Sequence, residues 1–277
     1  MLANMRLFLL FLPMMMLVHA ADLKDDLTFR APFDGSIDAT VGAGDKRLYN
    51  APNYKEQASA QPGLGAAAAD IELVPGAGRK GDALRFKKKN TKAIFFKADR
   101  NVAFEPKNWT GTISFWLNLD PDADLEPGFC DPIQVTDKAY NDSAIWVDFT
   151  KDDKPRHFRL GVFGALSSWN PQNTPTDKHP TFNNRLVVRK EPAFARGKWT
   201  HVAITFEKLG SGSGNATLYL DARPVGSTPA IAELFTWEMS KAAIRLGVNY
   251  VGLLDDVAVF KRALSAEEIR QIRSGKF

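Results

Sequence analysis

The stretch Gly252–Ile272 reads GLLDDVAVFKRALSAEEIRQI and joins a strand pattern to the start of a helix. Val257 and Val259 alternate with their neighbours, as side chains do on the two faces of a strand. Ser265 and Glu268 have the spacing of a capping box, in which each residue's side chain accepts a backbone N–H of the other. The stretch therefore predicts a two-faced strand followed directly by a short helix that docks on the sheet.

A period of two recurs through much of the chain. It is clearest in TISFWLNLD (112–120), WTHVAITF (199–206) and ATLYLDARPVGS (216–227), the last of which contains a turn. Further strands are expected at DALRF, AIFFKA, AIWVDFT, HFRLGVF, RLVVRK and AAIRLGV. Many short strands with turn signals and little helix are typical of sandwiches. We therefore expect an all-β fold of two antiparallel sheets with a short C-terminal helix.

The N-terminal residues, 1–20, have the pattern of a secretory signal peptide. Arg6 precedes an apolar run, Leu7–Val18, that ends in small residues. A retained membrane span is the alternative, but the run is short for one and Pro13 interrupts it. The pattern predicts a secreted or periplasmic protein with no stable membrane insertion after cleavage. The rest, residues 22–277, is expected to be one domain.

The net charge argues against nucleic-acid binding, and the cysteine content argues against disulfides and a cysteine nucleophile. The formal net charge is +4, a surplus too small to indicate a nucleic-acid-binding surface. Cys130 is the single cysteine, so no internal disulfide forms. With no histidine near it in a recognisable motif, a buried small residue is favoured over a nucleophile.

A long connection at about residues 165–194 is rich in Pro and Asn and carries aromatic side chains. Such a connection inside a compact domain is usually functional or disordered, and its aromatics argue against disorder. Sugars stack on aromatic rings and bond to amides and charged groups. The ligand-binding candidates are Trp169, Asn170, Asn173, His179 and Arg185 in this connection, with Trp146 and Asp148 on one strand face. The alternative for a loop Trp is that it pins the loop to the core.

Asp255 and Asp256 head the last strand, and alternation turns one of them toward the interior or a pocket. A buried carboxylate needs a partner, because its removal from water is costly. A hard cation such as Ca²⁺ accepts carboxylate and carbonyl oxygens from separate loops. A calcium site is one interpretation, and solvated or turn-capping aspartates are the other.

Five blocks occur in order between Gly78 and Ile272. They are GRKGDALRF, WTGTISFWLNLD, GKWTHVAITF, ATLYLDARPVGS and YVGLLDDVAVFKRALSAEEI. Together they resemble the laminin G-like jelly roll of the concanavalin A-like lectin and glucanase superfamily. FDGSIDA (33–39) resembles the first strand of that family. The resemblance implies a concanavalin A-like jelly-roll sandwich.

The resemblance also implies a function. Such domains commonly bind carbohydrate or protein, and many hold a structural Ca²⁺ between the first and last strands. Carried over, the metal ligands would be Asp256 and Asp34. One departure is Asp221-Ala222, where the family usually has Asp-Gly in a hairpin. Alanine accepts positive φ poorly, so this turn is not expected to be type I′.

Some superfamily members cleave polysaccharides, which makes catalysis a competing class. Their carboxylates lie on one strand as E-x-D-x-x-E, and this chain has no such run. The nearest segment, AIWVDFTKDD (144–153), lacks the glutamates. We therefore expect a non-catalytic exported module that binds a glycan. A module that binds a cell-surface protein is the alternative, and a polysaccharide-degrading enzyme is a weaker one.

Overall fold

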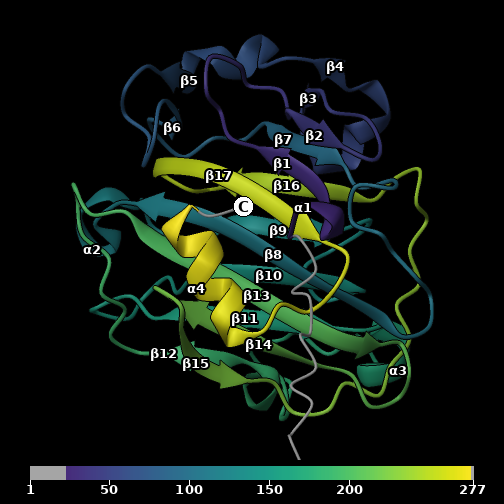
Figure 1. The fold of residues 1–277 in the computed structure, drawn as a ribbon. Coiled ribbons are helices and arrows are strands. Elements are labelled where there is room, and N and C mark those ends of the chain that lie inside the picture. Colours follow the sequence, from purple (N-terminus) through teal and green to yellow (C-terminus); the bar gives the residue numbers. More distant parts are fainter. Residues whose placement is uncertain (1–22, 276–277) are drawn as a thin grey trace, which may run out of the picture.

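The computed structural model of the protein describes residues 23–275, and the predicted signal peptide lies outside this part of the chain. Two antiparallel sheets pack face to face, as the sequence predicted (Figure 1). The first, the β8 sheet, has the order β15 (Arg223–Ser227), β14 (Asn215–Leu220), β13 (Thr200–Leu209), β8 (Trp109–Asn118), β17 (Gly252–Phe260), β1 (Leu27–Ala31) and β2 (Val41–Gly42). Beside β17 lies β6 (Ala83–Phe86), which pairs in turn with β5 (Ile71–Val74).

The second sheet, the β10 sheet, contains eight strands. Their order is β12 (Val187–Arg189), β11 (Phe158–Phe163), β10 (Ala144–Phe149), β9 (Cys130–Thr136), β16 (Ala243–Val248), β7 (Ala93–Lys97), β3 (Leu48–Ala51) and β4 (Gln61–Pro62). The helices are α1 (Leu23–Asp26), α2 (Pro121–Asp124), α3 (Leu166–Trp169) and α4 (Ala266–Ser274), with 3₁₀ turns η1 (Tyr54–Ser59), η2 (Gly65–Ala69) and η3 (Asn183–Arg185). Within residues 23–275, no helix is long and apolar enough to span a bilayer.

The main core lies between the two sheets, where alternate side chains of facing strands meet. Phe115 and Ile204 from the β8 sheet and Ile145 and Val147 from the β10 sheet are fully buried there. Cys130 joins the same core, and burial raises the pKa of its thiol to about 11. The thiol is therefore neutral at ordinary pH, which agrees with the structural role expected for it.

Helix α4 covers the outer face of the β8 sheet (Figure 1). The Ser265 hydroxyl accepts the Glu268 N–H, and the Glu268 carboxylate accepts the Ser265 N–H, so the predicted capping box is confirmed. Ile269 and Ile272 pack on Phe260 and its neighbours on the outer face of β17. The helix is thus fixed at its start by two hydrogen bonds and along its length by apolar contact.

One expectation about a strand was wrong, and some strands were not predicted. The segment 33–39, assigned to the first strand by resemblance, contains no strand, and Phe33 has a positive φ of 58°. The first strand is β1, which pairs with β17 through Phe29 and Val259. Strand β9 was not predicted at all, because Pro132 interrupts its alternation and proline cannot donate to a sheet ladder.

The turn between β14 and β15 also differs from expectation. Asp221 and Ala222 have φ of 49° and 62°, which are the two positive values that a type I′ turn requires. A left-handed alanine costs roughly 1 kcal/mol. Ala222 is buried in the same cluster as Ile269 and Ile272, so packing under α4 offsets that cost.

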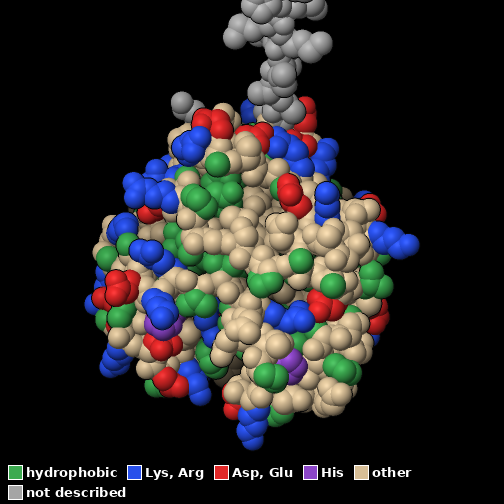
Figure 2. All heavy atoms as spheres, turned by 90° about the horizontal axis from the view of Figure 1, so that it is seen from below, with side chains coloured by type: hydrophobic (Ala, Val, Ile, Leu, Met, Phe, Trp, Pro, Cys, Tyr) green, Lys and Arg blue, Asp and Glu red, His purple; other side chains and the backbone are tan. Residues whose placement is uncertain are grey.

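On the face shown in Figure 2, Lys and Arg side chains are interspersed with Asp and Glu. This mixture is typical of a solvated protein surface.

Candidate functional site

The outer face of the β10 sheet holds a cavity of about 270 Å³. Strand β10 supplies Trp146 and Asp148 to it, while the intervening Val147 points into the core. The sequence placed these two residues together on one strand face, and the structure brings them together in the cavity. The full lining is Phe129, Asp131, Gln134, Tyr140, Trp146, Asp148, Arg159, Thr176, Phe182, Val248 and Asn249.

Two aromatic side chains at the cavity are open to solvent. Phe129 is 43% exposed and Tyr140 is 40% exposed, values that are unusual for large apolar side chains on this protein. The Tyr140 hydroxyl hydrogen-bonds the Thr176 hydroxyl at 2.7 Å, which ties the long connection to the rim of the sheet. Trp146 lies beneath, buried, and donates its ring N–H to the Tyr140 carbonyl. The cavity thus has a fixed aromatic floor and exposed aromatic walls.

An ion pair crosses the cavity between neighbouring strands. Arg159 on β11 donates its Nε to Asp148 Oδ1 at 2.8 Å and its Nη2 to Oδ2. The guanidinium also lies 5.0 Å from the centre of the Phe129 ring, a distance at which cation–π attraction operates. These contacts hold Arg159 in place, and both oxygens of Asp148 accept a hydrogen bond from it.

A second polar chain starts at Asp131 on β9. Gln134 donates to Asp131 Oδ2 at 2.9 Å, and Arg245 donates to the Gln134 side-chain oxygen at 2.7 Å. Burial raises the pKa of the Asp131 carboxyl well above its ordinary value, and the charge of nearby Asp148 raises it further. Asp131 is therefore held in its neutral form to higher pH than an ordinary carboxyl, and a neutral carboxyl can donate a hydrogen bond.

Trp169, the leading candidate from the sequence, is in α3 and is only 6% exposed. Its ring N–H donates to the Asn141 carbonyl at 2.9 Å, and its ring lies 5.0 Å from that of Phe163 on β11. Phe182 packs in the same cluster and lines the cavity. Trp169 thus holds the long connection against the outer face of the β10 sheet, which matches the alternative considered for a loop Trp.

The other candidates in the connection serve its own folding. Asn170 is buried and bonds both the N–H and the carbonyl of Thr174, while Asn173 is exposed with a positive φ of 50°. His179 packs its ring edge on Trp169. Arg185 pairs with Glu233 at 2.9 Å, and its guanidinium lies 5.2 Å from the Trp169 ring centre. The cavity lining does not include any of these four residues.

The predicted metal ligands have other partners. Asp256 lies at a bulge in β17 with φ of 51°, and Arg30 on β1 donates to its carboxylate at 2.8 Å. Asp34 accepts the backbone N–H of Asp82. The inward residue of the pair is Asp255, which is 1% exposed and accepts the Arg79 N–H at 2.8 Å. The buried carboxylate is therefore partnered by a backbone N–H, and Asp256 by a guanidinium.

A calcium site needs several oxygen ligands gathered around one point. Among residues 23–275, no group of three or more Asp, Glu, His or Cys side chains is placed to hold a metal ion. Asp256 and Asp34 are therefore not joined in a ligand set, and a guanidinium beside Asp256 disfavours a second cation there. Calcium binding stays a prediction of the resemblance.

Several cavity residues were missed from the sequence. Asp131 belongs to a strand that was not recognised, and Phe129 directly precedes that strand. Arg159 was on a predicted strand, HFRLGVF, and its position opposite Asp148 follows from the register of β10 and β11. Arg159 could have been identified only from the pairing of these two strands.

A family model described as the concanavalin A-like lectin/glucanases superfamily (Laminin_G_3) matches residues 88–270. No curated protein is similar enough to this chain to count as a match.

Solved structures show the same architecture at low identity. Domain 4 of AbnA, a GH43 extracellular arabinanase from Geobacillus stearothermophilus, in complex with arabinotriose, has a TM-score of 0.53 and 17% identity over 90% of this chain and 98% of that domain. The receptor binding domain of botulinum neurotoxin D has a TM-score of 0.58 and 12% identity over 92% of this chain. The binding domain of botulinum neurotoxin DC, in complex with rat synaptotagmin II, has a TM-score of 0.52 and 12% identity over 92% of this chain. The chain covers 54% and 52% of these two toxin chains.

Proposed function

From the premise that this chain belongs to the concanavalin A-like lectin/glucanases superfamily, we propose that it is an exported, non-catalytic module that binds carbohydrate. The site is the cavity on the outer face of the β10 sheet. Export is supported by the signal-peptide pattern of residues 1–20 and by the extracellular origin of the arabinanase whose domain shares the fold.

The observation that carries this proposal is the combination of side chains in the cavity. Phe129 and Tyr140 present exposed rings on which the apolar C–H face of a sugar can stack. Asp131, Gln134 and Asn249 supply donors and acceptors for sugar hydroxyls around them. A volume of about 270 Å³ is near the lower end for ligand pockets and suits one or two sugar units.

The ion pair supports binding over cleavage. Glycoside hydrolysis requires two carboxyl groups, one as acid and one as nucleophile or base. Asp131 and Asp148 are the two acidic residues of the cavity, and both oxygens of Asp148 accept from Arg159. Both oxygens are thus engaged by the guanidinium, so neither is free to attack a bound sugar.

Phe129→Ala is expected to weaken glycan binding about tenfold, because the variant loses a stacking ring worth about 1 kcal/mol or slightly more. Binding is measured by calorimetry against neutral oligosaccharides, arabinotriose among them. The matched control is Leu234→Ala, which removes a 51% exposed side chain outside the cavity and should leave affinity unchanged.

Three results would count against the proposal. Equal losses in both variants would indicate a general effect of apolar truncation, and release of reducing ends during the titration would indicate an enzyme. If folded protein bound none of the oligosaccharides, a protein partner would be favoured.

Asp131→Asn is expected to remove a pH dependence of glycan binding. In the natural protein, affinity should fall as the pH rises above the ordinary range of a carboxyl group, because Asp131 then loses its proton and with it a hydrogen-bond donor. The amide of asparagine keeps a donor at every pH, and its oxygen can still accept from Gln134. A variant whose affinity fell with pH as steeply as the natural protein's would exclude Asp131 as the donor.

A further inference from the structure

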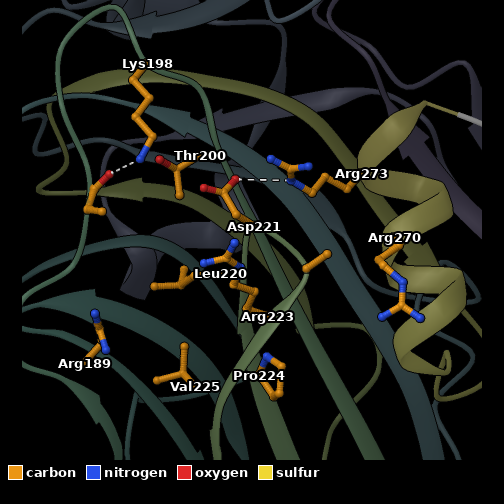
Figure 3. A pocket seen from close by; sticks show the side chains of 12 residues that line it. Arg189, Lys198, Thr200, Leu220, Asp221, Arg223, Pro224, Val225, Arg270 and Arg273 are labelled. Atoms are coloured by element: carbon orange, nitrogen blue, oxygen red, sulfur yellow. Dashed lines mark hydrogen bonds and ion pairs between the residues drawn. The ribbon is translucent and has the colours of Figure 1, made fainter.

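A second and larger cavity, the basic cleft, lies at the edge of the sandwich where β14 and β15 meet α4 (Figure 3). Its volume is about 910 Å³. Five cationic side chains line it: Arg189, Lys198, Arg223, Arg270 and Arg273. Asp221 is the one acidic residue in the lining. Five positive charges and one negative charge give the lining a formal net charge of +4, equal to that of the whole chain.

These cations come from separate parts of the fold. Arg189 ends β12, Arg223 begins β15, and Arg270 and Arg273 project from α4 (Figure 3). Like charges so arranged repel one another, and the repulsion costs free energy unless anions neutralise it. An arrangement built from three elements indicates a site with a defined shape.

Only two of the five cations in the cleft have a carboxylate as a partner. Arg273 lies 3.4 Å from Asp221, and Arg270 pairs with Glu267 on its own helix. Within residues 23–275, no carboxylate lies within ion-pair distance of Arg189, Lys198 or Arg223. Lys198 donates to the carbonyl of Ala193 and Arg189 to that of Glu191, contacts that leave their charge in place.

A buried hydroxyl group also lines the basic cleft. Thr200 is 3% exposed and lines the cleft between Lys198 and Asp221 (Figure 3). Its Oγ1 has no hydrogen-bond partner in the part of the chain that the structure describes. A buried hydroxyl without a partner costs about 1–3 kcal/mol, and a bound oxygen atom would satisfy it.

We propose that the basic cleft is a second ligand site that binds an acidic polysaccharide through the carboxylate or sulfate groups along its chain. Guanidinium forks match such groups with paired hydrogen bonds, and four of the five cations are arginines. The volume is near the upper limit for ligand pockets, which suits several sugar units and exceeds the need of one small anion. The requirement for anionic groups follows from the cleft alone, whereas the choice of a glycan rests on the proposed function.

The test compares polygalacturonate, dextran sulfate and uncharged dextran as ligands of the purified protein. We expect the two acidic polymers to bind and uncharged dextran not to bind at this site. Affinity should fall steeply as salt is added, because the contacts are ionic. The double variant R189Q/R223Q should weaken binding of the acidic polymers at least about tenfold. Both side chains are exposed and outside ion pairs, so the fold should survive, and thermal unfolding checks this.

The matched control is R100Q/K107Q, which likewise removes two exposed cations, lies outside the cleft and should have no effect on polymer binding. Loss of acidic-polymer binding with neutral-oligosaccharide binding intact would establish two separate sites. Equal losses in the two double variants would overturn the proposal, since they would indicate attraction by net charge. Binding of single-stranded DNA without binding of either acidic polymer would overturn it as well.

Discussion

Replacing Trp169 with alanine is expected to lower the free energy of unfolding by about 3 kcal/mol, in line with other buried Trp truncations. Its ring packs with Phe163 and Phe182 and is capped by His179, so removal opens a void under the long connection. We expect glycan binding to weaken too, because Thr176 and Phe182 reach the cavity from that connection. Chemical denaturation and calorimetry measure the two effects.

Trp169→Phe separates packing from ligand contact. The variant keeps an aromatic ring in the cluster and loses the hydrogen bond from Nε1 to the Asn141 carbonyl, at a cost of about 1 kcal/mol. Its glycan affinity should match that of the natural protein. An alanine variant with unchanged stability and no glycan binding would instead place Trp169 in direct contact with the ligand.

Replacing Asp255 with asparagine is expected to change how stability depends on pH. Burial raises the pKa of the Asp255 carboxyl from 3.8 to about 7, and its Oδ1 has no hydrogen-bond partner within residues 23–275. The folded protein therefore holds this proton at pH values where the unfolded chain has lost it. The resulting penalty grows as the pH rises from about 4 to about 7 and is complete above that range.

Three pKa units correspond to about 4 kcal/mol. Between about pH 4 and about pH 9, the stability of Asp255→Asn should therefore rise by about 4 kcal/mol relative to the natural protein. The absolute gain at high pH is smaller, because the amide leaves a buried donor unpaired at a cost of about 1–3 kcal/mol. Urea unfolding across this range measures the difference. A difference that stayed flat across this range for Asp255→Asn would exclude a buried titrating carboxyl.

The strands that could be predicted are those whose two faces meet different surroundings. In β8 and β13, residues such as Ile113 and Ile204 face the core while their neighbours face α4, so alternation is visible in the sequence. Strand β9 lacks this signal because Pro132 interrupts it. Strand β3 and the edge strand β4 are short, and their residues carry too few alternations to be recognised.

The candidate site was predictable only where it lies within one strand. Trp146 and Asp148 are two residues apart, so strand geometry alone puts them on one face. Asp131, Tyr140 and Arg159 join them through sheet pairing and a loop, which no local pattern encodes. Trp169 in the long connection was predicted to contact a ligand, but its ring is buried against the sheet. Composition does not distinguish an aromatic ring that anchors a loop from one that contacts a ligand.

The carboxylates of the last strand show a similar limit. Strict alternation in β17 fails at the bulge between Asp255 and Ala258, so the facing of Asp256 could not be counted from Val257. Its partner, Arg30, lies 226 residues away in the sequence. Only the pairing of β1 with β17 brings the two charges together.

Leu23 and α4 pack in one cluster on the outer face of the β8 sheet, so both ends of the described chain lie on the opposite side of the sandwich from the β10-sheet cavity (Figure 1). The geometry determines what an immobilised sample reports. Capture on a sensor chip through the C-terminal end holds α4, with Arg270 and Arg273, toward the support and leaves the cavity facing the solution. Capture in this orientation favours measurement of neutral sugars, whereas acidic polymers are better measured with the protein free in solution.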